Sequence, residues 1–110
     1  MIAAAVQAGM VAAPGYFTPT EAFTALDAGA QALKLFPAEG ASPAVLKAQR
    51  AVLPKEVPIL IVGGVQPGDM AKWRQAGANG FGLGSGVFTP GRSPDDVHAR
   101  AKSYVEAARS

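Results

Sequence analysis

The 110-residue sequence contains no cysteine. This absence excludes a disulfide framework, a thiolate-ligated zinc or iron–sulfur site, and a thiol nucleophile. Charged residues are few (16%) and hydrophobic residues make up 49%, a balance that excludes a disordered chain. No apolar run reaches the roughly 18 residues that a membrane span needs, and no basic residue precedes the apolar stretch 1–13, as a signal peptide would require. We therefore expect a cytoplasmic protein with no membrane partner.

Neither sign of charge dominates. The 10 basic and 8 acidic residues are well mixed along the chain and leave a net charge of +2. A nucleic-acid-binding domain needs a basic face, so no nucleic-acid partner is expected. The length is enough for one small domain, and residues 1–110 are treated as one unit.

What the sequence does have is a recurring helix start. A proline follows Ser, Thr or Gln at intervals of 24, 24 and 27 residues, in the pairs Thr18-Pro19, Ser42-Pro43, Gln66-Pro67 and Ser93-Pro94. Proline suits the first helical position, and Ser or Thr before it caps the free N–H groups. Thr18 and Glu21 also have the spacing of a capping box.

Apolar stripes on these predicted helices are typical of helices that pack on a sheet. In the second helix the candidate core residues are Val45, Leu46, Ala48 and Leu53. In the third they are Met70, Trp73 and Ala76. At this spacing Trp73 is predicted to be a core residue rather than a stacking platform.

Short apolar runs without polar alternation alternate with the helices. The runs Met10–Ala13, Ala32–Phe36, Ile59–Val62 and Phe81–Leu83 are predicted to be buried parallel strands, after a helical segment at 2–8. Alternating β and α units predict an α/β fold with a parallel sheet and right-handed crossovers. A doubly wound sheet usually has about five or more strands, and a (β/α)₈ barrel takes roughly 200 residues or more. Four units are therefore expected to be about half of a small barrel.

Lys34 is the one lysine of five that falls inside a predicted strand. Period two puts it on one face with Ala32 and Phe36, and puts Leu33 and Leu35 on the other. Burial of a lysine in a strand covered on both sides favours the neutral amine, which attacks carbonyl carbons. The alternative is a lysine whose stem packs while its ammonium reaches water at the sheet end.

Two glycine clusters follow the last two predicted strands. Gly63-Gly64 ends the third strand, and Gly84-Ser85 lies in a Gly-rich segment at the end of the fourth. Glycine lets the backbone approach a ligand and turn N–H groups towards an anion, and barrels often bind phosphate after their last two strands, at a helix N-terminus. The alternative is tight turning between strand and helix.

Other sites find little support. No G-x-G-x-x-G segment leads directly into a helix, and no Gly-Lys-Ser/Thr exists, which argues against a dinucleotide site and a P-loop. His98 stands alone on a predicted helix and is expected at the surface. The carboxylates fall mostly on helix starts and faces. No metal and no cofactor are therefore expected.

Together these segments resemble the carboxyl-terminal half of the class I 2-keto-3-deoxy-6-phosphosugar aldolases. The resemblance is carried, in order, by Pro14–Ala22 (PGYFTPTEA), Leu33–Ala38 (LKLFPA), Val62–Val65 (VGGV) and Gly82–Ser85 (GLGS). The Leu-Phe-Pro-Ala context and the valine before Gly-Gly are more similar to the phosphogalactonate enzyme than to the phosphogluconate one.

The resemblance implies a (β/α)₈ barrel of the TIM-barrel type, with this chain forming the last four βα units. It implies that Lys34 forms a Schiff base with pyruvate and that phosphate binds at Gly63, Gly64, Gly84 and Ser85. The implied reaction is the reversible cleavage of a phosphosugar acid to pyruvate and glyceraldehyde 3-phosphate, without a cofactor. The family usually assembles as a homotrimer.

The family's acid/base glutamate and carboxylate-binding arginine belong to the first half of the barrel, which this chain is expected to lack. Glu39, just past Pro37-Ala38, is not predicted to replace that glutamate. Four parallel strands would also leave open edges and an uncovered inner face.

Two rival functions stay open: a non-catalytic phosphate-binding half-barrel that assembles with itself or with a missing half, and a fragment of another phosphosugar barrel enzyme such as an isomerase. Lys34 within a strand argues against the isomerase.

Overall fold

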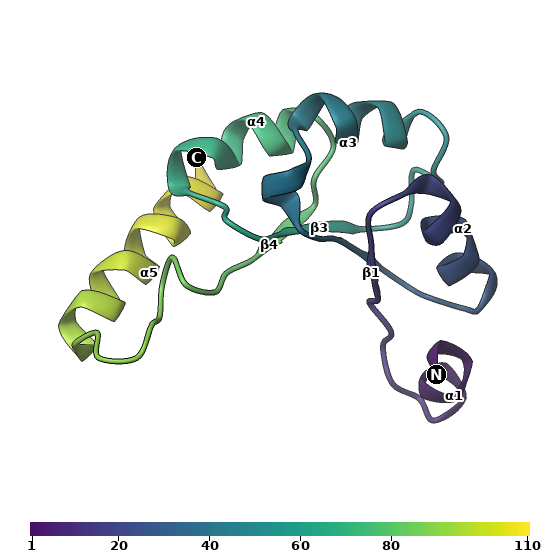
Figure 1. Cartoon of the computed structure of the whole chain (residues 1–110), viewed down its shortest axis with the longest axis horizontal. Helices are drawn as coiled ribbons and strands as arrows, with labels where there is room; N and C mark the ends of the chain where they lie inside the picture. Colours follow the sequence, from purple (N-terminus) through teal and green to yellow (C-terminus); the bar gives the residue numbers. More distant parts are fainter.

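The computed structural model describes residues 1–110 and contains a four-stranded sheet with helices along one of its faces (Figure 1). The strands are β1 (Gly15–Tyr16), β2 (Leu33–Leu35), β3 (Ile59–Val62) and β4 (Gly80–Gly82). The helices are α1 (Ile2–Gln7), α2 (Pro19–Asp27), α3 (Pro43–Arg50), α4 (Met70–Gln75) and α5 (Pro94–Arg109), with short 3₁₀ turns η1 (Ala38–Gly40) and η2 (Pro67–Asp69). No helix is long and apolar enough to cross a membrane.

The strands lie side by side in the order in which the chain visits them. All three pairings are parallel, with Gly15 opposite Lys34, Lys34 opposite Leu60, and Leu60 opposite Gly80. Helices α2, α3 and α4 all lie on the same side of the sheet (Figure 1). A doubly wound sheet would carry helices on both faces. The predicted α/β class and parallel sheet are confirmed, and so are the open edges and the uncovered face.

Three of the four predicted helix starts are confirmed by side-chain caps, at Thr18, Ser42 and Ser93, whereas Gln66-Pro67 opens the η2 turn without one. The Thr18 hydroxyl accepts from the Glu21 N–H at 3.3 Å, and the Glu21 carboxylate accepts from the Thr18 N–H at 3.0 Å, which completes the capping box. These hydrogen bonds from Thr18 hold the pKa of Glu21 below its ordinary value. The Ser42 and Ser93 hydroxyls each accept from a first-turn N–H of α3 and α5, without the reciprocal carboxylate bond. A cap and the N–H group that it binds lie within one turn of each other, which is why these helix starts could be predicted from the sequence alone.

The predicted first strand, Met10–Ala13, is wrong: the strand is Gly15–Tyr16. The backbone before it does follow β2, because the Ala12 carbonyl accepts from the N–H groups of residues 31 and 32. Pro14, however, has no N–H with which to continue a ladder. Met10 is 63% exposed, so the apolar run lies beside the sheet edge without a helix over it.

The core lies between the sheet and the helices. The four inward strand side chains are fully buried: Leu33, Leu35, Ile59 and Ile61. The helices add Leu46, Met70, Trp73 and Tyr104, so the prediction for Trp73 is confirmed. Val45 and Ala48, predicted to face inward on α3, are exposed instead. Besides Leu46, the buried residue on α3 is Gln49, whose side chain accepts from the Tyr16 hydroxyl at 2.8 Å and donates to the Phe17 carbonyl at 3.1 Å.

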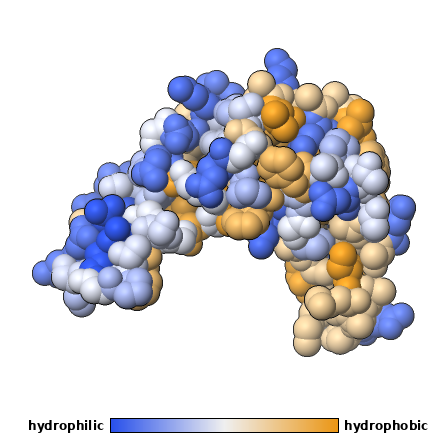
Figure 2. All heavy atoms as spheres, viewed as in Figure 1, coloured by the Kyte–Doolittle hydropathy of each residue, from blue (hydrophilic) through white to orange (hydrophobic).

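The molecule is an arch rather than a compact ball. Its radius of gyration is 15.0 Å, whereas about 13 Å is expected for this length. It exposes 6612 Å², roughly 900 Å² more than the approximately 5,700 Å² expected for 11.2 kDa. The first and last helices form the two legs, and Figure 2 shows the hollow between them. The uncovered face of the sheet is thus part of a surface that a closed domain would bury.

Arg50 joins the loops at the amino ends of β3 and β4. Its guanidinium donates to the carbonyls of Val57 at 2.9 Å and Gly77 at 3.0 Å, and it also contacts the Asn79 side-chain oxygen. That same oxygen accepts from the Ile59 N–H at 2.9 Å. One partly buried side chain therefore fixes the end of the sheet opposite to the glycine clusters.

Candidate functional site

The uncovered face of the sheet holds a cavity of about 610 Å³ at the carboxyl ends of the strands. All five predicted site residues line it: Lys34, Gly63, Gly64, Gly84 and Ser85. Residues of β3, β4 and the loops after them make up most of the remaining wall. The structure therefore brings together the side chain and the two glycine clusters that the sequence singled out.

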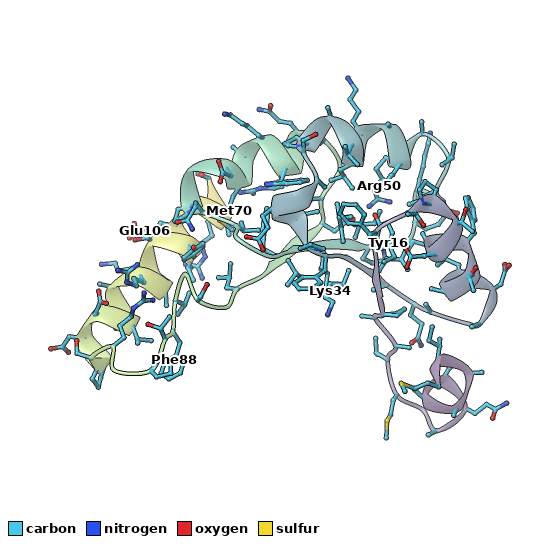
Figure 3. All side chains as sticks on the ribbon, in the orientation of Figure 1. Tyr16, Lys34, Arg50, Met70, Phe88 and Glu106 are labelled. Atoms are coloured by element: carbon cyan, nitrogen blue, oxygen red, sulfur yellow. The ribbon has the colours of Figure 1, made fainter.

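Lys34 lies at the centre of β2 and points into the hollow of the arch, away from the helices (Figure 3). It is half-buried between two fully buried leucines, which confirms the predicted alternation. Its ammonium nitrogen lies 5.5 Å from the centre of the Phe36 ring, and its stem lies over Gly15. The strand is not covered on both sides, so the dry environment considered for Lys34 is absent. Its amine is reachable from the cavity, in which it is the only cationic side chain.

Gly63 and Gly64 form a tight loop that packs on the η1 turn. Their φ angles are +111° and +71°, which lie in the left-handed region that L side chains rarely adopt. A Cβ on Gly63 would lie 3.1 Å from the Ala38 nitrogen, and one on Gly64 would lie 2.8 Å from a carboxylate oxygen of Glu39. This loop therefore requires glycine at both positions for backbone conformation and for space.

Gly84 and Ser85 lie in a more open turn. A Cβ on Gly84 would meet no atom within 4 Å. The turn is closed by the N–H groups of Val87 and Phe88, which donate to the Gly84 carbonyl at 2.9 and 3.0 Å. It does not lead into a helix, because Pro90 and Gly91 follow and α5 begins only at Pro94. The predicted helix N-terminus at this cluster is therefore wrong, and a single turn takes its place.

Both glycine clusters have backbone N–H groups without an acceptor in the chain, on residues that line the cavity. The N–H groups of residues 63–65 and 84–86 donate no hydrogen bond within the chain. All six residues line the same cavity. Backbone N–H groups rarely stay without a partner, and sets of them that face one space form an anion-binding concavity. The arrangement can hold a phosphate-like anion near a lysine amine.

Glu39 is the only carboxylate that lines this cavity. It comes from η1, its carboxylate contacts Gly64, and it also lines a neighbouring cavity of about 290 Å³ with Ser42, Asp69 and Lys72. Sequence reasoning gave it no role, because nothing in the spacing placed η1 against the Gly63-Gly64 loop. No group of three or more His, Asp or Glu side chains is placed to hold a metal ion.

Comparison with known proteins gives a consistent family match. Residues 1–99 match the family model described as KDPG and KHG aldolase. The chain is 47% identical over 109 residues to the 2-dehydro-3-deoxy-6-phosphogalactonate aldolase of Escherichia coli (strain K12). The match covers 99% of this chain and 53% of that protein, so the chain spans about half the length of this curated relative.

Two solved structures resemble the chain closely. The first, described as native KDPGal, has a TM-score of 0.95 and 47% identity, and the match covers 98% of this chain and 52% of that one. The second is a cube-shaped, porous protein cage designed by fusing symmetric oligomeric domains. It also has a TM-score of 0.95 and 47% identity, over 98% of this chain and 40% of that one.

Proposed function

Because the chain belongs to the KDPG and KHG aldolase family, we propose that it is the half of a class I aldolase barrel that carries the Schiff-base lysine and the phosphate site. The reaction is the reversible cleavage of 2-dehydro-3-deoxy-6-phosphogalactonate, or its gluconate epimer, to pyruvate and glyceraldehyde 3-phosphate. The observation that carries the proposal is one cavity lined by the Lys34 amine and by two sets of free backbone donors. An amine and an anion site in one space suit a phosphorylated keto acid.

In this proposal the neutral amine of Lys34 attacks the C2 ketone of the substrate, and loss of water gives a protonated imine. The imine then takes up the electron pair of the C3–C4 bond, the C4 hydroxyl loses its proton, and the aldehyde leaves. The resulting enamine gains a proton at C3, and water hydrolyses the imine to release pyruvate. The resemblance assigns the proton transfers to a glutamate in the other half of the barrel, so this chain supplies binding and imine formation.

The phosphate end of the substrate is proposed to bind between the two glycine clusters. The N–H groups of Gly63, Gly64, Gly84 and Ser85, together with the Ser85 hydroxyl, are the donors. Gly84 offers a clean test, because a side chain there meets nothing within 4 Å and its φ is not left-handed. Gly84→Asp should abolish stabilisation of the chain by phosphate, which is about 2.7 kcal/mol at 100 times the Kd. Gly84→Asn should reduce it less, because it adds bulk without charge.

Gly68→Asp is the matched control for this test. Gly68 also has open space around a Cβ and an ordinary φ, but it does not line the cavity. Thermal melting with and without phosphate measures all three variants. Equal loss of phosphate stabilisation in Gly84→Asp and Gly68→Asp would place the anion elsewhere.

The sheet is proposed to be half of a closed barrel. Sequential parallel strands with helices on one side support this, since closure needs further strands between the free edges of β1 and β4. The covering partner is a complementary set of four βα units or further copies of this chain, in a homo-oligomer such as the family's trimer. We expect the isolated chain to associate or to be marginally folded. A monomer in sedimentation with a cooperative thermal transition would contradict this.

Reductive trapping tests the catalytic part of the proposal. Pyruvate and borohydride should leave a reduced, covalent adduct on Lys34, because imine formation needs only the amine and the bound keto acid. Peptide mapping by mass spectrometry locates the adduct, with Lys47, Lys55, Lys72 and Lys102 as internal controls. Lys34→Arg should abolish it. Even labelling of all five lysines would overturn the assignment of Lys34.

A second candidate function is a non-catalytic phosphate-binding half-barrel. It is favoured by the position of Lys34 on an uncovered face, where water reaches the ammonium. In that case phosphate still stabilises the chain and Gly84→Asp still abolishes the effect, while pyruvate leaves no preferred adduct on Lys34.

A further inference from the structure

We propose that Arg92 and Tyr104 are positioning residues. They attach the two glycine-containing loops to helix α5 and so keep these loops at a fixed distance from each other. This inference rests on the proposed phosphate site, since it assigns a role in forming that site. Neither side chain lines the cavity itself. Each instead binds a backbone carbonyl in one of the two loops, and both are linked to the same helix.

Arg92 joins the Ser85 turn to the start of α5. One nitrogen of its guanidinium donates to the Ser85 carbonyl at 2.9 Å, and another lies 3.3 Å from the carboxylate of Asp96 in the first turn of α5. The side chain is only 17% exposed, although it comes from a surface loop. A planar guanidinium held at two points restricts the turn to one orientation.

The orientation of this carbonyl matters for the donors. In a trans peptide the C=O of Ser85 and the N–H of Gly86 point in opposite directions. Binding of the Ser85 carbonyl by Arg92 therefore keeps the free N–H of Gly86 turned away from the arginine. Because Gly86 also lines the cavity, this N–H is a further donor beside the four proposed above. Without Arg92 this peptide plane can rotate and present an oxygen, which repels an anion, where the N–H was.

Tyr104 makes the corresponding contact with the other loop. Its buried hydroxyl donates to the Val65 carbonyl at 2.6 Å, directly after Gly63-Gly64. The same hydroxyl occupies the space that a Cβ on Gly86 would need, so it also contacts the second loop. One phenol on α5 thus contacts both segments that line the cavity.

Arg100 provides a matched control for Arg92. It also binds Asp96, at 3.1 Å, but it donates no hydrogen bond to either loop. Loss of Arg100 therefore removes a positive charge and an ion pair with Asp96 and leaves the Ser85 carbonyl bound. Any difference between equivalent Arg92 and Arg100 variants reports the contact with Ser85.

The test is a titration of the full 110-residue chain with inorganic phosphate, followed by calorimetry and by thermal melting. Arg92→Gln should raise the Kd for phosphate about tenfold, since a charge-assisted hydrogen bond orients a donor of the site. Arg100→Gln should stay within about twofold of wild type, the size of a screened surface charge effect. Arg92→Lys should recover less than half of the lost affinity, because an ammonium keeps the charge without the two-point geometry.

The variants separate a positioning role from an effect of charge alone and from a merely structural role. Equal affinities for Arg92→Gln and Arg100→Gln, or full recovery in Arg92→Lys, would overturn the positioning role in favour of charge alone. Tyr104→Phe should raise the Kd by about three- to tenfold, since the freed Val65 carbonyl no longer fixes its loop. A lower melting temperature with an unchanged Kd would make Tyr104 merely structural.

Phosphate binding by the wild-type chain shows which of the two proposals fails, the phosphate site or the positioning role. If wild type itself binds no phosphate, the proposed anion site is wrong and the positioning role is wrong with it. If wild type binds phosphate and every variant binds equally well, only the positioning role is overturned. Should Tyr104→Phe fail to fold, the Arg92 and Arg100 pair decides, because both arginines lie on exposed segments.

Discussion

The two faces of the sheet are built by the same short strands and yet do different work. On the face towards the helices, Leu33, Leu35 and Ile61 are fully buried and hold the chain together. On the other face, Lys34 and Leu60 are only half-buried and line the cavity. Alternation along a strand thus places core side chains on one face and cavity-lining side chains on the other. A substitution on the covered face should therefore change the free energy of unfolding. A substitution on the open face should mainly change ligand binding.

The largest difference between the two faces is expected when a side chain is truncated, because only the covered face is packed. Ile61→Ala should lower the free energy of unfolding by about 2–5 kcal/mol, because it opens a cavity in a packed core. Leu60→Ala, one residue away on the open face, should cost clearly less, since water already reaches that side chain. Urea denaturation of both variants measures the difference. Equal losses would mean that the open face is buried in solution, as by association.

The stability of the covered face should also depend on alkaline pH, because the Tyr16 hydroxyl lies on that side. Burial raises its pKa from 10.0 to about 12, with a smaller opposing effect from the Arg50 guanidinium. The neutral phenol is favoured in the folded state, so its contribution is complete below pH 10 and is lost as the pH rises towards 12. Wild type should therefore lose about 2–3 kcal/mol more than Tyr16→Phe across this window. Parallel stability profiles of the two proteins would contradict it.

The two glycine clusters on the open face should also differ from each other. Gly64→Ala should cost about 1–2 kcal/mol of stability, because its φ of +71° is unfavourable for alanine. Its new Cβ would also press on Glu39. Gly84→Ala should be close to neutral, since it has space and an ordinary φ. Thermal melting without phosphate compares the two variants. A larger loss of stability in Gly84→Ala would show that the turn at Gly84, rather than the Gly63-Gly64 loop, is the conformationally restricted one.

The smallest expected effect concerns charge in the cavity. Glu39→Gln should tighten phosphate binding by about two- to fivefold, because the carboxylate beside Gly64 repels an anion and the repulsion is partly screened by salt. Glu56→Gln, which neutralises an exposed carboxylate outside the cavity, is the control and should leave the Kd unchanged. Weaker binding in Glu39→Gln would show instead that the carboxylate orders the loop.

Features encoded by a few adjacent residues could be predicted from the sequence. All four helix starts have a proline at the first turn and three of them also have a capping Ser or Thr, and the structure has helical turns at each of them. The alternation that places Lys34 opposite Leu33 and Leu35 is equally local. Parallel strands end at one edge of a sheet, which is why the lysine and both glycine clusters share a cavity.

Features that depend on distant partners could not be predicted. Gln49 is buried because the Tyr16 hydroxyl and the Phe17 carbonyl, more than 30 residues away, satisfy its amide. The first strand is Gly15–Tyr16 rather than the more apolar run before it, because pairing with β2 selects the segment that α2 and α3 cover. Glu39 reaches the cavity only through the packing of η1 on the loop after β3.

The network around Arg50 lies at the amino ends of the strands, whereas the cavity lies at their carboxyl ends. The loops that Arg50 joins hold the amino ends of β3 and β4 together, and none of its hydrogen-bond partners lines the cavity. Outside the Gly63-Gly64 loop, substitutions at the carboxyl ends can therefore accumulate while this network keeps the opposite end of the sheet in place. Such a scaffold lets evolution exchange one ligand chemistry for another while the strands stay in place.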